Sequence, residues 1–138
     1  MGSVDVARLN ILIVEDNVHF RTLIRSILQA LGMSQLEEAR DGMEALELLG
    51  DPDRTSLTDL VILDWKMDGM DGVECVRQIR KLQGPHGSVP IIMVTGYTET
   101  SLQNEARDAG VNGFLGKPIS PRSLMGRISS VMETQHAE

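Results

Sequence analysis

The sequence predicts an α/β domain whose parallel β-sheet is covered by helices on both faces. Short runs of aliphatic and β-branched residues alternate with stretches whose apolar residues recur at helical spacing, from one end of the chain to the other. The first run is almost continuously apolar, which is typical of a strand buried on both faces.

Five runs predict the strands. The first is broken only by Asn10, the third ends at Asp64, and the fourth has Pro90 near its start, where a missing N–H is tolerated. The second run gives the weakest prediction. In chain order, the predicted strands are residues 9–14, 35–40, 60–63, 89–94 and 111–115.

Five stretches predict helices, one after each strand. Gly32 ends the first and Gly110 the fourth, at residues 98–109, since glycine commonly ends helices. Gly42 follows the turn into the second, and Ser120 is the expected N-cap of the last. The apolar faces are Phe20, Leu23, Ile24, Ile27, Leu28 and Leu31, then Met43, Leu46 and Leu49, then Val73, Val76, Ile79 and Leu82, and finally Leu124, Met125, Ile128, Val131 and Met132.

Length, net charge and cysteine content limit the kinds of protein that this chain can be. The 138 residues support one domain that folds without disulfides. A formal net charge of −7 argues against binding to nucleic acid, which needs a basic face. The single cysteine, Cys75, cannot form an internal disulfide, and no apolar run reaches membrane-spanning length. We therefore expect a cytoplasmic protein with no membrane association.

Acidic side chains follow two strands that are neighbours in the common order 2-1-3-4-5. Glu15 and Asp16 follow the first strand, and Asp64 ends the third, so three carboxylates converge where ligands bind such sheets. Each pair repels by roughly 1 to 4 kcal/mol, and Mg²⁺ among these oxygens would relieve the repulsion. The alternative is that Asp16 or Asn17 only caps the next helix.

Two more residues fall at the same edge of the predicted sheet. Thr95 follows the fourth strand and Lys117 the fifth. If a phosphoryl group is transferred to Asp64, the Lys117 ammonium can pair with Asp64 before the transfer and with a phosphoryl oxygen after it. The Thr95 hydroxyl can bind another phosphoryl oxygen. Phosphoryl transfer needs mainly positioning and positive charge, and a carboxylate is a recognised covalent acceptor. The pattern predicts that Asp64 accepts a phosphoryl group.

Five segments together resemble the receiver domain of bacterial two-component response regulators, of the single-domain, CheY-like chemotaxis type. They lie at residues 11–17, 39–46, 63–72, 93–97 and 113–119. The resemblance predicts a receiver domain over residues 8–134, with flexible termini at 1–7 and 135–138. It implies a flavodoxin-like (βα)5 three-layer sandwich with a five-stranded parallel sheet in the order 2-1-3-4-5.

The resemblance also implies roles around the acceptor. Asp64 takes a phosphoryl group from a phosphohistidine on a sensor histidine kinase or a histidine phosphotransfer protein. Asp16, Asp64 and the Lys66 backbone carbonyl bind Mg²⁺ directly, Glu15 binds it through water, and Mn²⁺ can substitute. The protein catalyses only its own phosphorylation and its dephosphorylation by an in-line water, so it is a phosphorelay switch and not an enzyme.

The family's switch lies on one side of the domain. By resemblance, Thr95 moves toward the phosphoryl group, Phe114 swings inward with it, and Lys117-Pro118 is a cis peptide. Thr95 and Lys117 also assist transfer. The fourth and fifth strands and their helices form the face that controls a downstream protein partner, and Gly72 permits the tight turn after the acceptor.

Three residues depart from the family pattern. Asp68 replaces the usual proline and adds a carboxylate near the pocket. Lys66 stands where a side chain faces the attacking water, so we hypothesise that it alters the phosphoryl lifetime. Gly96 replaces the commoner alanine and is expected to make the switch loop more mobile.

Several features have simpler interpretations. His19, His86 and His136 lack metal-ligand spacing, so surface positions are expected. Cys75 is interpreted as a structural thiol. Five methionines are expected to fill gaps in the core: Met33, Met67, Met93, Met125 and Met132.

Two other function classes fit less well. An aspartate-nucleophile phosphatase places an acid two residues after the nucleophile, where this chain has Lys66. A flavodoxin-like electron carrier needs a neutral, hydroxyl-rich loop where Glu15 and Asp16 stand. A receiver that no longer accepts phosphate stays open, and a native single-domain regulator looks the same as a receiver cut from a longer protein.

Overall fold

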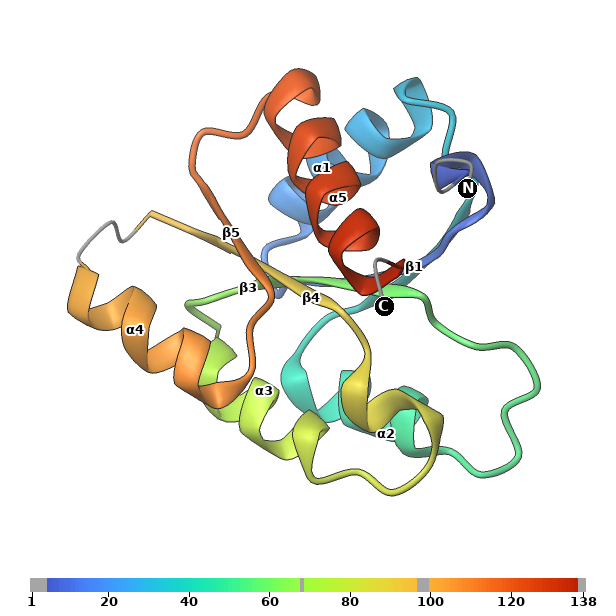
Figure 1. Ribbon diagram of the computed structural model, residues 1–138, viewed down its shortest axis with the longest axis vertical. Coiled ribbons are helices and arrows are strands. Elements are labelled where there is room, and N and C mark those ends of the chain that lie inside the picture. Colours follow the sequence, from blue (N-terminus) through green and yellow to red (C-terminus); the bar gives the residue numbers. More distant parts are fainter. Residues whose placement is uncertain (1–4, 68, 97–99, 137–138) are drawn as a thin grey trace.

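The computed structural model describes residues 5–67, 69–96 and 100–136 (Figure 1). Its five parallel strands form one sheet in the order β2-β1-β3-β4-β5, which confirms the predicted fold class. The strands are β1 (Asn10–Val14), β2 (Gln35–Ala39), β3 (Leu60–Asp64), β4 (Ile91–Thr95) and β5 (Gly113–Gly116). The helices are α1 (Val18–Ala30), α2 (Gly42–Gly50), α3 (Gly72–Arg80), α4 (Thr100–Ala109) and α5 (Pro121–His136), with 3-10 turns η1 (Val6–Arg8) and η2 (Pro85–Ser88).

The core lies on both faces of the sheet, because successive side chains of a strand point to opposite faces. Leu12 and Val14 pack in a cluster with residues of α2 and α3, whereas Ile11 and Ile13 pack with residues of α1 and α5. Figure 1 shows α1 and α5 on one side of the sheet and α2, α3 and α4 on the other. Replacing a fully buried residue such as Leu12 by alanine is expected to cost about 2–5 kcal/mol. The predicted core methionines are confirmed, with Met125 partly buried and four fully inside: Met33, Met67, Met93 and Met132.

Side-chain caps determine where the helices near the sheet edge begin. Asn17 accepts a hydrogen bond from the Phe20 N–H at 3.0 Å, so Asn17, and not Asp16, caps α1. Asp71 caps α3 in the same way at 2.8 Å. Ser120 accepts from the Ser123 N–H at 3.1 Å, as predicted. Each cap contributes about 1 kcal/mol.

Two strands begin two residues later than predicted, and β1 begins one residue later, at Asn10. β4 begins at Ile91, because the N–H of Val89 donates back to η2 at 3.1 Å and Pro90 has no N–H to give. β5 begins at Gly113, because the N–H of Val111 donates to the last turn of α4 at 3.1 Å. Residues 98 and 99 of the predicted fourth helix lie outside the described residues.

Three predictions about single side chains were wrong. Leu23, expected on the apolar face of α1, is 46% exposed, and Ile24, Ile27 and Leu28 supply the buried face of that helix. Met43 is 56% exposed, and Ala45 supplies the buried face of α2 together with Leu49. His86 is buried: its Nε2 accepts the Thr58 N–H at 2.9 Å, so its Nδ1 donates to the Leu49 carbonyl oxygen, also at 2.9 Å. The ring thereby joins the end of α2, the following loop and η2.

Candidate functional site

Three carboxylates meet at the carboxyl ends of β1 and β3. Glu15 and Asp16 follow β1, and Asp64 is the last residue of β3. One carboxylate oxygen from each residue lies within 4.8 Å of the other two. Glu15 and Asp64 are only 1% and 5% exposed, and Asp16 is half-buried. The predicted acidic pocket is therefore present.

The environment of Glu15 fits a cation. The pKa of its carboxyl is raised to about 8, mainly by burial and also by the neighbouring Asp64 and Asp16, against an opposing hydrogen bond from the Asn17 backbone N–H. Oε2 accepts that N–H at 3.0 Å, whereas Oε1 is buried without a hydrogen-bond partner among the described residues. An unpaired buried oxygen beside two other carboxylates is the donor set that Mg²⁺ takes in proteins.

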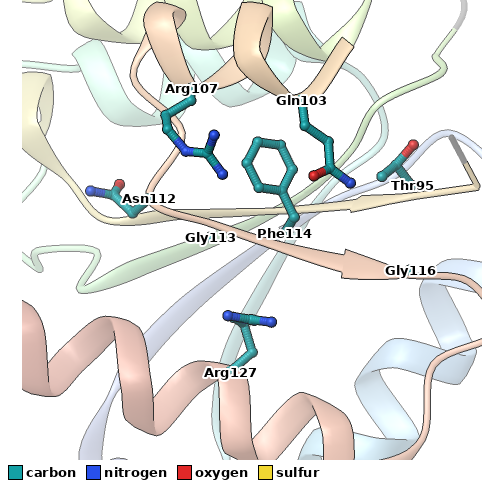
Figure 2. Close-up of a pocket in the computed structure, with 8 residues that line it drawn as sticks. All are labelled: Thr95, Gln103, Arg107, Asn112, Gly113, Phe114, Gly116 and Arg127. Atoms are coloured by element: carbon teal, nitrogen blue, oxygen red, sulfur yellow. The ribbon is translucent and has the colours of Figure 1, made fainter. Parts of the chain in front are cut away.

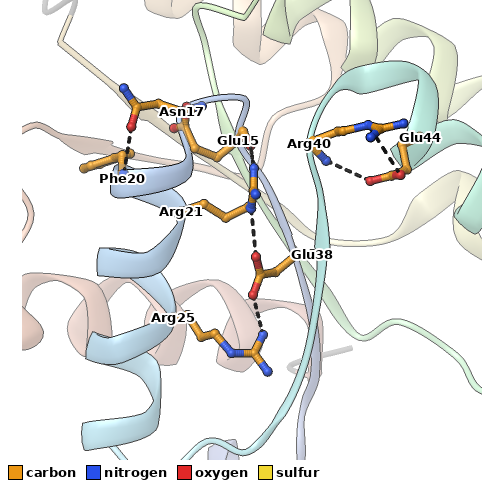
Figure 3. Close-up of polar contacts among 8 residues, drawn as sticks. All are labelled: Glu15, Asn17, Phe20, Arg21, Arg25, Glu38, Arg40 and Glu44. Atoms are coloured by element: carbon orange, nitrogen blue, oxygen red, sulfur yellow. Dashed lines mark hydrogen bonds and ion pairs between the residues drawn. The ribbon is translucent and has the colours of Figure 1, made fainter.

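An ion-pair network holds the backbone at Glu15 (Figure 3). Arg21 of α1 donates to the Glu15 carbonyl oxygen at 2.7 Å and to Glu38 of β2, also at 2.7 Å. Arg25 binds the second carboxylate oxygen of Glu38 at 2.7 Å. The two arginines thus tie α1 to β1 and β2 directly behind the acidic pocket.

The ammonium of Lys117 lies between a carboxylate and an aromatic ring. Its Nζ is 3.2 Å from Asp64 Oδ1 and 4.5 Å from the centre of the Phe20 ring. Lys117 follows β5, whose register sets Gly116 opposite Thr95, and its N–H donates to the Thr95 carbonyl oxygen at 2.9 Å. The ring contact was not foreseen from the sequence, where Phe20 was expected only to pack in the core.

A pocket of about 250 Å³ opens beside the Asp64 carboxylate. Asp64, Trp65 and Lys66 line one part of it, and Thr95 and Lys117 line another. Thr95 is 2% exposed, whereas Lys66 is exposed to solvent. Residues at the ends of three strands, β3, β4 and β5, therefore surround one space large enough for a phosphoryl group.

Gly72 packs closely against the segment that leaves β3. Its N–H donates to the Trp65 carbonyl oxygen at 2.6 Å, and an added Cβ would lie 2.7 Å from the Asp64 carbonyl oxygen. A side chain at this position would therefore displace the backbone of Asp64 and Trp65. Asp68, on the same loop, lies outside the described residues.

Phe114 lies apart from the acidic residues. It is half-buried on β5 and lines a different pocket, to which Thr95 also contributes. The Lys117–Pro118 peptide bond is cis. The structure thus brings Glu15, Asp16, Asp64 and Lys117 together and leaves Phe114 on the far side of Thr95.

The fold and the site together define a class: a (βα)5 domain with a carboxylate cluster where the strand order reverses. A family model for the response regulator receiver domain matches residues 11–129. Chemotaxis protein CheY-3 of Vibrio cholerae is 33% identical over 125 residues, which cover 91% of this chain and 92% of that protein. The structure of CheY4 of Vibrio cholerae covers 89% of this chain, with a TM-score of 0.79 and 31% identity, and 98% of its own chain is matched.

A longer relative matches equally well. The cyclic di-GMP phosphodiesterase response regulator RpfG of Xanthomonas campestris pv. campestris is 35% identical over 126 residues. The match covers 91% of this chain and only 32% of that protein, so this chain spans about a third of its length.

This chain belongs to the response regulator receiver domain family, as the sequence indicated. It is a signalling switch rather than an enzyme, and the family pairs it with a histidine kinase or a histidine phosphotransfer protein. In the described part of the chain, every helix is too short or too polar to cross a bilayer.

Proposed function

We propose that this protein is a phosphoacceptor response regulator of a two-component or phosphorelay system, with Asp64 as the acceptor. The observation that carries the proposal is the convergence of three carboxylates within 4.8 Å, with the Lys117 ammonium 3.2 Å from Asp64. The chemotaxis names of several relatives favour motility as the process controlled. The receiver domain is proposed to occupy residues 8–134.

The metal fits the acidic pocket. We propose that Asp16, Asp64 and the Lys66 carbonyl hold Mg²⁺ directly and that Glu15 holds it through water, with Mn²⁺ as a substitute. When bound, the cation neutralises the negative charge that gathers on the transferred group. The buried Oε1 of Glu15 and the repulsion among the carboxylates support this arrangement.

The transfer step follows from the positions of three residues. An Asp64 carboxylate oxygen attacks phosphorus and forms an O–P bond, while the P–N bond of the phosphohistidine breaks and its electron pair returns to the imidazole. Lys117 exchanges its contact with Asp64 for one with a phosphoryl oxygen, and the Thr95 hydroxyl donates to another. In dephosphorylation, water attacks phosphorus and the O–P bond to Asp64 breaks. Inorganic phosphate, which keeps the protons of the water, leaves and the Asp64 carboxylate is restored.

The output follows from the same movement. Thr95 moves toward the phosphoryl group and Phe114 occupies the space behind it, which changes the face formed by β4, α4, β5 and α5. That face binds a downstream protein target. The proximity of Thr95 both to Asp64 and to the Phe114 pocket supports this route.

The fluorescence of Trp65, the chain's only tryptophan, tests the proposal because this residue adjoins Asp64 and lines its pocket. Adding Mg²⁺ and then beryllofluoride, which mimics an acyl phosphate, is expected to change the emission in two saturable steps. Asp64→Asn should lose the second step. Asp51→Asn, which removes an exposed carboxylate on the loop after α2, should keep both. An unchanged second step in Asp64→Asn would refute the assignment.

A further inference from the structure

A second pocket, of about 380 Å³, lies over β5 on the face assigned to the output. Figure 2 shows two arginines on opposite sides of the strand, Arg107 from α4 and Arg127 from α5, with Phe114 beside Arg107 and Thr95 near the end of β4. None of the residues that line it is acidic.

These two guanidinium groups lack carboxylate partners among the described residues, although acidic residues outnumber basic ones, 20 to 13, in the whole chain. Arg107 contacts the side-chain oxygen of Asn104 at 3.2 Å and the Phe114 ring, whose centre is 5.3 Å from its Cζ. By contrast, the arginines that lie near β2 pair with glutamates: Arg21 and Arg25 with Glu38, and Arg54 with Glu37.

Gly113 holds Arg127 against the strand. A Cβ added at Gly113 would lie 3.1 Å from Arg127 Cδ and 2.8 Å from a methyl carbon of Val131. The aliphatic stem of Arg127 therefore packs on the backbone of β5 and directs the guanidinium into the pocket, as Figure 2 shows. Because Gly113 has no side chain, the stem of Arg127 can lie against β5, and its positive charge is held at this face.

We propose that the partner of this face is a peptide segment rich in carboxylates, which places acidic side chains against Arg107 and Arg127. Arginine suits carboxylates because its planar fork forms two parallel hydrogen bonds. Two guanidinium groups on opposite sides of β5 match acids spaced along a chain better than one small anion. This inference rests on the proposed function, since it names the partner class of the switched face.

The pocket is linked to the acceptor through Thr95. Within the described residues, Thr95 is the one residue that lines both this pocket and the pocket over Asp64. A shift of Thr95 toward the phosphoryl group alters the space beside Phe114, and with it the ring on which Arg107 lies. Binding equilibria that share a residue in this way are coupled reciprocally. If a phosphoryl mimic raises the affinity for the acidic segment by some factor, the acidic segment raises the affinity for the mimic by the same factor.

An NMR titration tests the inference and detects weak binding. A short peptide of alternating glutamate and serine is added to the full chain with Mg²⁺, with and without beryllofluoride, and a lysine–serine peptide serves as the control. Shifts are expected to concentrate on β5, α4 and α5, to strengthen with beryllofluoride and to weaken with salt. Arg107→Glu with Arg127→Glu should weaken binding about tenfold or more. Arg122→Glu, the same exchange at a single residue of α5 outside the pocket, should not, and each single variant, Arg107→Glu or Arg127→Glu, should weaken binding more than it does.

Four outcomes would overturn the inference: scattered shifts, equal binding of the lysine peptide, retained binding in the double variant, or binding indifferent to beryllofluoride. Displacement of the peptide by inorganic phosphate at lower concentration would instead make this a small-anion site. The Trp65 response separates the two proposals. If Trp65 responds to beryllofluoride but the peptide does not bind, the phosphoacceptor function stands and only the partner class is wrong. If Trp65 does not respond, the proposed function itself fails.

Discussion

At the scale of single residues, Lys117 shows how the site holds its positive charge. The ammonium is drawn to the Asp64 carboxylate and lies over the Phe20 ring at the same time. Its side chain is 35% exposed, so neither contact is screened as fully as it would be in open water. The ring limits the positions that the long, flexible lysine can adopt.

Phe20→Leu is therefore expected to weaken beryllofluoride binding about two- to fivefold, because a cation–π contact at a partly exposed site contributes about 0.5–1 kcal/mol. Trp65 fluorescence measures the affinity. Phe20→Tyr keeps the ring and should keep the affinity. The effect of Phe20→Leu should also vanish in a Lys117→Met background; an undiminished effect there would make the role of Phe20 merely structural.

Lys66 is the second residue whose side chain we expect to affect the reaction. It is exposed and lines the pocket over Asp64. We expect Lys66→Ala to shorten the phosphoryl lifetime by up to about fivefold, because its ammonium attracts the phosphoryl oxygens and its stem covers the approach of water. Loss of radiolabelled phosphate gives the rate, with Lys81→Ala, an exposed lysine away from the pocket, as control. An equal rate in both variants and the parent chain would dismiss the role.

The residue-level predictions succeeded where topology alone decides position. Glu15, Asp16 and Asp64 could be predicted to meet because parallel strands end at one edge. The contact between Phe20 and Lys117 could not, since it depends on side-chain rotamers of residues far apart in the sequence. His86 was placed wrongly because a lone histidine has the same pattern whether exposed or buried; only the Thr58 N–H and the Leu49 carbonyl oxygen explain its burial.

At the scale of elements, the segment between β3 and α3 is held by close backbone packing. Gly72 lies against Asp64 and Trp65, with three backbone atoms of those residues within 2.9 Å of where a Cβ would stand. These are main-chain atoms of the strand end, which cannot move aside as a flexible side chain could. The beginning of α3 and the acceptor thus form one rigid unit.

Gly72→Ala is expected to destabilise the fold by about 1–3 kcal/mol and to disturb the Trp65 response, because overpacking shifts the backbone. Gly126→Ala is the matched control: Gly126 lies within α5 with no atom within 4 Å of an added Cβ, so alanine should stabilise by about 0.5–1 kcal/mol. Urea denaturation measures both. A neutral Gly72→Ala would show that the loop yields easily.

Element boundaries were predicted less well than the elements themselves. The apolar runs extend into residues that complete turns, so Val89 and Val111 were counted as strand although their N–H groups bond backward. Hydrophobicity reports burial and not hydrogen-bond partners, and both residues are buried. β2 has a polar sequence because it lies at the edge of the sheet, with β1 as its neighbour, and this made it the weakest of the predicted strands.

At the scale of the whole molecule, the net charge of −7 includes three acids held within 4.8 Å. Their repulsion is a cost of folding that a bound cation removes. The alternation of strands and helices predicted the fold class, and the resemblance to receiver domains implied the strand order that the sheet has. The arginine pocket over β5 escaped prediction, since Arg107 and Arg127 are far apart in sequence and only the packing of α4 and α5 beside β5 makes them neighbours.

Mg²⁺ is therefore expected to stabilise the protein, by about 1.4 kcal/mol at ten times its dissociation constant. Asp64→Asn should be more stable than the parent chain in a chelator, because one repelling charge is gone, and should gain less stability from Mg²⁺. Thermal unfolding measures both, with Asp51→Asn as the control that keeps the gain. Equal stabilisation by sodium chloride of the same ionic strength would reduce the effect to general screening.

The position of Lys117 after β5, more than fifty residues beyond Asp64, has a consequence for biosynthesis. A ribosome releases the three clustered acids once β3 has emerged, but the lysine that offsets them follows β5 and emerges much later. Until then, the carboxyl ends of β1 and β3 carry these negative charges without the Lys117 ammonium. Cellular magnesium is the available counter-ion in that interval, so the ion that serves signalling would also assist the protein during its own synthesis.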